Sequence, residues 1–170
     1  MKVRRARAAD AAAIHSLINY YAEQGLLLAR DAEEIRANFR HFLLLEDAGA
    51  VAGCVALEPY GSSLAEIRSL AIAPGVRSQG LGRRLLDAVV AEAKRRGIAR
   101  VFAVTHAPGF FLRRGFQARK RRMLPEKIER DCIRCPKAAA CQLAAVVADV
   151  LPERAALRVL DPVAAAPVTA

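Results

Sequence analysis

Three observations in the sequence predict a single domain of the α/β (α+β) class. The 170 residues suit one globular domain and can bury about two-thirds of the surface of the unfolded chain. Segments with the pattern of strands alternate with segments of helical periodicity. A glycine-rich turn, Gly80-Leu81-Gly82, follows a strand and leads directly into a long amphipathic helix. We therefore expect helices that flank a central sheet.

The first third of the chain contains a strand, two helices and the start of a hairpin. A short strand over Val3–Ala6 precedes a helix that Asp10 can cap and that ends at Gly25. Asp31, followed three residues later by Glu34, resembles a capping box and predicts a second short helix. The first helix carries apolar side chains at helical spacing: Ile14, Leu17, Ile18 and Tyr21.

Strands dominate the prediction for the rest of the chain. Phe42–Glu46 and Ala50–Glu58 form a hairpin around the turn Asp47-Ala48-Gly49, and Leu64–Ile72 is a third strand that ends before Pro74-Gly75. The later elements are a helix from the glycine turn through Arg96, a strand over Arg100–Thr105, a helix over Phe110–Arg114, and strands over Phe116–Met123 and Leu143–Val150. Residues 1–150 form the expected domain, and the alanine- and proline-rich residues 151–170 a loosely held tail.

The charge of the chain is concentrated in one stretch. The net charge is +10, whereas residues 77–137 alone carry 17 basic and 5 acidic side chains, a net +12. Such a concentration predicts an anionic partner for the middle of the chain. There is no helix-turn-helix signal and few aromatic side chains to stack on bases, so we do not expect nucleic acid. Without a long apolar run or a signal peptide, we expect no membrane contact and a cytoplasmic location.

The segment after the third strand is typical of a phosphate site. Its glycines let the backbone approach an anion, and the N–H groups and dipole of the following helix point toward it. It is neither a Walker loop nor a GxGxxG motif. The alternative is a glycine-rich start of a helix with solvated arginines. The residues predicted to bind phosphate are Arg77, Ser78, Gln79, Gly80, Leu81, Gly82 and Arg83.

Two motifs in this region resemble those of the GNAT superfamily of acyl-CoA-dependent N-acetyltransferases. They are Arg77-x-x-Gly80-x-Gly82 after a strand and the later Phe111-x-x-x-Gly115-Phe116, and the resemblance covers about residues 1–150. It implies a GNAT fold, a mixed and strongly twisted sheet whose central parallel strands splay apart. It also implies acetyl-CoA as co-substrate, with coenzyme A in the splay and Phe111 packed on its pantetheine. We expect no metal cofactor. The pantetheine amides would pair with the backbone of Leu70, Ala71 and Ile72.

Further segments are similar to short, stand-alone amino-acid N-acetyltransferases of the N-acetylglutamate synthase type. These are Gly25–Arg30, Ala65–Ile72, Leu124–Lys127 and Asp131-Cys132-x-x-Cys135-Pro136. The resemblance implies transfer of acetyl from acetyl-CoA to the α-amine of an acidic amino acid, L-glutamate, the first step of arginine biosynthesis. Glutamine, another amine or a protein lysine are alternative acceptors, and a non-catalytic acyl-CoA-binding module is an alternative function. The sequence leaves a homodimer open.

The chemistry requires a group that takes a proton from the amine and groups that help the thiolate leave. Glu66 and Arg68 project from one face of their strand, as do Leu70 and Ile72, and Glu66 is the candidate base. A glutamate paired with a nearby arginine, with no catalytic role, is the alternative. Many GNAT enzymes have a tyrosine at the position of Phe111 that protonates the thiolate. Water, Tyr21 or His106 could replace it, or the thiolate could leave unprotonated, and His106 is the second catalytic candidate.

An acceptor with two carboxylates needs at least two cationic side chains, preferably arginines for bidentate pairing. Arg30 is the first choice because it ends an apolar loop. Residues 119–122 are all basic and would alternate along a strand, so only half of them can face a pocket. The predicted acceptor residues are Arg30, Arg68, Arg121 and Lys127.

Cys132, Cys135 and Cys141 form a C-x2-C-x5-C pattern. Three thiolates suit a structural zinc, but such sites normally have four ligands. Thiols that only pack a loop, or a reversible link between Cys132 and Cys135, are the other interpretations.

Overall fold

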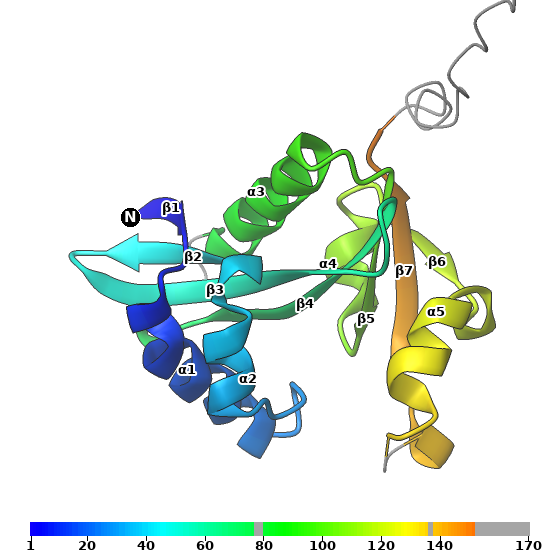
Figure 1. Cartoon of the computed structure of the whole chain (residues 1–170), viewed down its shortest axis with the longest axis horizontal. Coiled ribbons are helices and arrows are strands. Elements are labelled where there is room, and N and C mark those ends of the chain that lie inside the picture. The colour runs from blue at the N-terminus through cyan, green and yellow to red at the C-terminus, as the bar shows by residue number, and fades with distance from the viewer. Residues whose placement is uncertain (77–79, 136–137, 152–170) are drawn as a thin grey trace, which may run out of the picture.

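The computed structural model describes residues 1–76, 80–135 and 138–151 as one mixed α/β domain (Figure 1). Seven strands form a single sheet in the order β1-β2-β3-β4-β5-β7-β6. Their bounds are β1 Lys2–Arg5, β2 Phe42–Asp47, β3 Ala50–Pro59, β4 Leu64–Ile72, β5 Arg100–Thr105, β6 Gln117–Arg119 and β7 Ala144–Asp149. The helices are α1 Ala11–Glu23, α2 Ala32–Ala37, α3 Leu81–Arg95, α4 Pro108–Leu112 and α5 Pro125–Lys127, with short 3-10 turns and one π-helical turn, Ile128–Cys132.

The helices cover both faces of the sheet (Figure 1). On one face α3 packs against alternate side chains of β2 and β3, including Leu45, Val55 and Leu57. On the other face α1 and α2 pack against the intervening side chains Phe42 and Leu44. The side chains of β2 and β3 thus alternate between the two faces of the sheet.

The two central strands separate along their length. β4 and β5 are parallel, and their described pairing covers Leu64–Arg100, Ala65–Val101 and Glu66–Phe102 only. Beyond this point β4 continues to Ile72 and β5 continues to Thr105, but their described residues no longer pair with each other. The predicted splay of the parallel strands is confirmed, and it leaves backbone polar groups of both strands available to a ligand.

Two details of the predicted elements are wrong. Asp10 does not cap α1, because its carboxylate accepts hydrogen bonds from the Arg7 N–H, at 2.7 Å, and from the Arg4 guanidinium. The strand predicted over Phe116–Met123 is only three residues long and pairs with β7 alone, at the edge of the sheet. Arg121–Met123 forms a 3-10 turn instead, so the alternation expected for residues 119–122 does not hold. By contrast Asp31 caps α2 as predicted, since its side chain accepts from the N–H groups of Glu33 and Glu34.

Candidate active site

A cavity of about 590 Å³ occupies the splay between β4 and β5. Leu70, Ala71 and Ile72 of β4 line one side, and Phe111 of α4 and His106 line another. The first turn of α3 closes one end of the cavity with Gly80, Leu81, Gly82 and Arg83. The structure therefore brings together the described residues that the sequence assigned to the cofactor. Arg77, Ser78 and Gln79, assigned to the same group, lie outside the described residues.

The start of α3 presents backbone N–H groups at one end of the cavity. Gly80 precedes the helix with φ +71°, a left-handed conformation that glycine adopts without steric cost. The first hydrogen bond of the helix runs from the Arg84 N–H to the Gly80 carbonyl at 3.1 Å. The N–H groups before Arg84 have no acceptor in the helix, and they add to the positive end of its dipole.

A β-bulge in β4 separates the two halves of that strand. Ala56 pairs with Arg68 and Cys54 with Ala71, so β4 has one residue more than β3 in this interval. Ser69 lies at the bulge with φ +54°. As a result Leu70 and Ile72 pack on the α3 side of the sheet, with Ile67, whereas Glu66 and Arg68 face the opposite side.

A second cavity, of about 330 Å³, adjoins the first on the face that carries Glu66 and Arg68. The two cavities share Leu26, Leu27, Arg68, Ser69, Val104, Thr105 and His106. Arg121, Lys127 and the thiols of Cys132, Cys135 and Cys141 also line the second cavity. The two cavities therefore meet at these shared residues, and Glu66 lines the second cavity.

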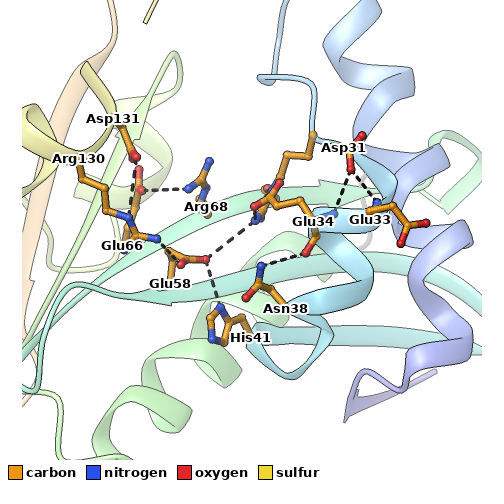
Figure 2. Close-up of polar contacts among 12 residues, drawn as sticks. Asp31, Glu33, Glu34, Asn38, His41, Glu58, Glu66, Arg68, Arg130 and Asp131 are labelled. Atoms are coloured by element: carbon orange, nitrogen blue, oxygen red, sulfur yellow. Dashed lines mark hydrogen bonds and ion pairs between the residues drawn. The ribbon is translucent and has the colours of Figure 1, made fainter. Parts of the chain in front are cut away.

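Glu66 belongs to a buried polar network. Its residue is 3% exposed, and its Oε2 accepts hydrogen bonds from Lys127 Nζ at 2.9 Å and from the Tyr60 hydroxyl at 3.1 Å. Lys127 Nζ and the Tyr60 hydroxyl also lie 2.5 and 2.6 Å from Asp131 Oδ2. Arg68 Nη1 is 3.9 Å from Glu66 Oε2 (Figure 2). Glu66 is therefore a buried carboxylate with defined donors, and its Arg68 contact is the longest of them.

Burial and charge move the pKa values of two members of this network. Burial and the carboxylates of Glu66 and Asp131 raise the pKa of Tyr60, so its hydroxyl stays protonated and can donate. Burial alone would raise the pKa of Asp131, but hydrogen bonds from Lys127 and Tyr60 outweigh it and lower that pKa. Asp131 is thus an anion that holds the Lys127 ammonium beside Glu66.

A second buried carboxylate, Glu58, lies next to this network on the neighbouring strand β3. It pairs across the sheet with Glu66 and binds Arg130 Nη2 at 2.6 Å and His41 Nδ1 at 3.2 Å (Figure 2). Burial opposes ionisation of Glu58, but the hydrogen bonds from His41 and Arg130 outweigh it and lower its pKa to about 2. The Arg130 guanidinium also stacks 4.5 Å from the centre of the Tyr60 ring. Glu58 therefore fixes Arg130, and Arg130 holds the ring of Tyr60.

The predicted acceptor residues differ in their surroundings. Arg68, Arg121 and Lys127 line the second cavity, whereas Arg30 is not among the residues that line it. The Arg30 side chain is 2% exposed and pairs with Glu34 through both Nε and Nη2, with Nη1 3.5 Å from Ser69 Oγ. Arg30 thus contacts Ser69 at the bulge without lining the second cavity, and its role in binding the acceptor stays a prediction.

Tyr60 and Asp131 are site residues that sequence reasoning missed. Tyr60 follows β3 and Asp131 lies in the π-helical turn, more than 60 residues apart in the chain. The sequence signal for Asp131 is the Asp-Cys-x-x-Cys segment, which indicates a resemblance to a family but not a role for the Asp131 carboxylate.

The described residues contain neither a metal-binding cluster nor a membrane-spanning helix. In residues 1–76, 80–135 and 138–151 no group of three or more His, Cys, Asp or Glu side chains is placed to hold a metal ion. The helices of the same part of the chain include none long and apolar enough to cross a membrane.

Known proteins resemble this chain along most of its length. The model of the acetyltransferase (GNAT) family matches residues 9–116. An uncharacterized N-acetyltransferase of Chlorobaculum tepidum is 41% identical over 145 residues, 85% of this chain and 94% of that protein. An amino-acid acetyltransferase of Neisseria meningitidis is 35% identical over 133 residues, 77% of this chain and 30% of that protein.

A solved structure shares both the fold and part of the sequence. N-acetylglutamate synthase from Neisseria gonorrhoeae, complexed with coenzyme A and N-acetyl-glutamate, superimposes with a TM-score of 0.80 at 31% identity. The match covers 89% of this chain and 35% of that one, so this chain spans about a third of the Neisseria proteins. With its splayed parallel strands, its glycine turn before α3 and a family match over residues 9–116, the chain belongs to the acetyltransferase (GNAT) family.

Proposed function

We propose that the protein transfers the acetyl group of acetyl-CoA to the α-amine of an acidic amino acid, with L-glutamate as the preferred acceptor. The observation that carries this proposal is the meeting of two cavities at the splay, one beside the anion-binding start of α3 and one containing a buried carboxylate and three cations. The product would be an N-acetylated amino acid of the kind bound in the Neisseria gonorrhoeae structure. In a cell that makes arginine by this route, the reaction would be its first step.

Coenzyme A would occupy the 590 Å³ cavity. Its pyrophosphate would accept hydrogen bonds from the N–H groups at the start of α3, and the charge of Arg83 would add to the field there. The pantetheine amides would pair with the backbone of β4 at Leu70–Ile72, where the described pairing with β5 has ended. This arrangement directs the thioester toward the residues that both cavities share.

Glu66 would act as the general base. The acceptor enters as an ammonium ion, and its amine attacks the thioester carbonyl only after it loses a proton. Lys127 and Tyr60 hold one oxygen of the Glu66 carboxylate, which fixes the orientation of the group. Glu66 would take the proton directly or through one water molecule.

The carboxylates of the acceptor would bind to Arg68 and Arg121. Both arginines line the 330 Å³ cavity, and guanidinium groups can pair with carboxylates through two hydrogen bonds. Arg30 would contribute through its contact with Ser69, at the bulge between the two cavities. An acceptor without a side-chain carboxylate would leave one of these cations without a partner, which favours an acidic amino acid.

The thiolate of coenzyme A would leave near His106. Phe111 is 5% exposed and cannot donate a proton, and the Tyr21 hydroxyl already donates to the Ile72 carbonyl at 2.5 Å. His106 is exposed and lines both cavities, so it is the described side chain best placed to supply a proton from solvent. This role would help the departure of the thiolate without being essential to it.

The proposal is tested by incubating the protein with acetyl-CoA and each amino acid while following the release of free thiol. We expect the highest kcat/KM with L-glutamate, lower values with L-glutamine and L-aspartate, and little turnover of a lysine peptide. A higher kcat/KM with glutamine would overturn the acidic preference. No release of thiol with any of these acceptors would overturn the enzymatic proposal and leave only the non-catalytic acyl-CoA-binding module.

The role of Glu66 is tested by Glu66→Gln, with Glu126→Gln as the matched control on an exposed carboxylate. Loss of a general base costs typically ~10²-fold or more in kcat. We expect a loss of that size for Glu66→Gln, with the KM for acetyl-CoA unchanged, and full activity for the control. A Glu66→Gln protein with more than half of the parent kcat would show that the base lies elsewhere.

A further inference from the structure

Three thiols form part of the wall of the 330 Å³ cavity, and the proposed transfer reaction uses none of them. Cys132, Cys135 and Cys141 are free and half-buried, and all three line the cavity that contains Glu66 and Arg68. Among the described residues, none from the segment 121–143 that carries them lines the 590 Å³ cavity. The thiols therefore lie on the acceptor side of the site alone.

The backbone places Cys132 and Cys135 within disulfide range of each other. The π-helical turn Ile128–Cys132 ends at Cys132, and the Cys135 N–H donates to the Cys132 carbonyl at 3.1 Å. This hydrogen bond closes a four-residue turn, whose first and last Cα atoms lie within about 7 Å of each other. A disulfide needs Cα atoms roughly 4.4–6.8 Å apart, so the pair can be joined with little movement of the chain.

The cysteines differ in their access to a reagent. Cys135 lines both the 330 Å³ cavity and a neighbouring cavity of about 780 Å³, so a small oxidant can reach it from two sides. Burial raises the pKa of the Cys132 thiol, although Lys127 and Arg121 act against that rise. Cys132 is therefore suited to react second, with an already oxidised neighbour. Cys54 is fully buried, and burial raises its pKa to about 12, so it should not react.

We propose that Cys132 and Cys135 are a reversible oxidation site in the wall of the acceptor cavity, with a hydroperoxide as the oxidant. The Cys135 thiolate attacks the peroxide oxygen and becomes a sulfenic acid, and the peroxide O–O bond breaks to release water or an alcohol. The Cys132 sulfur then attacks the sulfenic sulfur and expels a second water as the disulfide forms. Two thiols are oxidised and one peroxide is reduced; a dithiol reductant then converts the disulfide back to two thiols and is itself oxidised.

The disulfide would change the acceptor side of the site. The residues that lead into the turn include Lys127 and Asp131, whose side chains hold Glu66 in its network. Joining Cys132 to Cys135 tightens the end of this segment and fixes two side chains of the cavity wall. This consequence rests on the proposed function, and it predicts a change in the KM for the amino acid rather than for acetyl-CoA.

The oxidation site is tested by mass spectrometry of the whole chain, independently of activity. The protein is treated with one equivalent of hydrogen peroxide, alkylated, digested and mapped, and compared with a sample reduced by dithiothreitol. We expect the loss of two hydrogen atoms and a peptide containing the Cys132–Cys135 link. Cys141 should remain a free thiol that can be alkylated, and Cys54 should be alkylated only after denaturation. Four alkylated thiols, or a link that includes Cys141, would overturn the proposal.

The consequence is tested by the ratio of oxidised to reduced activity in three variants. In the parent we expect oxidation to raise the KM for the acceptor by at least about tenfold, which corresponds to ~1.4 kcal/mol of binding. The ratio should fall to about one in Cys132→Ser and in Cys135→Ser and remain in Cys141→Ser. An equal effect of peroxide in all three would contradict the assignment. A chain that transfers no acetyl at all would overturn the proposed function, while the peptide map would still decide the oxidation site.

Discussion

Glu92 illustrates how a single residue of α3 joins the helix to the edge of the sheet. Its side chain is 1% exposed and accepts hydrogen bonds from Arg96 Nε at 2.7 Å, from Arg5 Nη2 at 2.9 Å and from Arg95. Burial would raise the pKa of this carboxyl, but the three arginines outweigh it and lower the pKa to about 2. A buried carboxylate with several charged donors contributes to stability as long as it remains ionised.

We expect Glu92→Gln to lower the free energy of unfolding at pH 7 by about 1.5–3 kcal/mol, the range for hydrogen bonds to charged groups. Because the folded-state pKa lies below the ordinary value of 4.5, the stabilisation by Glu92 is complete above pH 4.5 and is lost as the pH falls toward 2. The difference between parent and variant should therefore shrink between pH 4.5 and 2 in urea titrations. Asp87→Asn, on an exposed carboxylate of the same helix, is the control and should change stability little. A difference that is constant with pH would contradict the assignment.

Among the elements, β3, β4 and α3 come into close contact at Gly53. A Cβ atom added there would lie 2.7 Å from Ile72 Cδ1, 2.9 Å from the Ala71 carbonyl and 3.1 Å from Leu85 Cδ1. The Ala71 carbonyl belongs to the backbone and cannot move without disturbing β4. Only glycine lets this part of β4, just beyond the bulge, lie so close to β3.

We expect Gly53→Ala to destabilise the protein by about 1–3 kcal/mol, the usual cost of overpacking a core. Since Ile72 lines the 590 Å³ cavity, the KM for acetyl-CoA should rise as well. Gly75→Ala is the matched control, because a Cβ atom there would meet nothing within 4 Å. Urea unfolding and steady-state kinetics measure both effects. Equal stability of the two variants would show that β4 shifts freely at this point.

At the scale of the whole molecule, the distribution of charge is the dominant feature. The excess of basic residues lies in 77–137, which begins at the turn before α3 and includes the exposed Arg83, Arg84, Arg113 and Arg114. Exposed charges attract an anionic ligand from a distance, and dissolved salt screens that attraction over about 10 Å at 0.1 M ionic strength.

We expect the KM for acetyl-CoA to rise about threefold or more between 0.05 and 0.5 M sodium chloride, with kcat almost unchanged. Acetyl-pantetheine, which lacks the phosphates, is the control donor, and its KM should not depend on salt. Initial rates with the two donors at several salt concentrations measure this. The same salt dependence with both donors would show that salt weakens binding of the amino acid or the stability of the fold, rather than binding of the phosphates.

Prediction from the sequence succeeded where a residue pattern reports on one local contact. The apolar stripe of α1, the cap at Asp31 and the alternation in β2 and β3 each depend on neighbours within a few residues. The edge strand β6 was overestimated because alternation of side chains cannot show where the partner strand ends. Asp10 lies at the start of α1 as the sequence predicts, but its carboxylate bonds to Arg7 and Arg4 instead of the helix, because a 3-10 turn, Ala8–Asp10, precedes α1.

For the candidate site as well, the sequence predicted local features and missed contacts between distant segments. The glycine turn was located from the sequence because its function depends on the local backbone, and Gly80 and Gly82 line the expected cavity. The network around Glu66 was not, because Tyr60, Lys127 and Asp131 come from segments that only the fold brings together. Arg30 was chosen for its apolar neighbours in the chain, yet its surroundings are set by Glu34 and by the bulge.

By itself the sequence determined the class of fold, the glycine turn before α3 and the concentration of positive charge, since each follows from the types and spacing of residues that are neighbours in the chain. Only the tertiary structure decided the order of the strands, the bulge at Ser69 and the partners of Glu66. The physical reason is that a buried carboxylate is stabilised by donors from distant parts of the chain, and their identity depends on how the strands and turns pack.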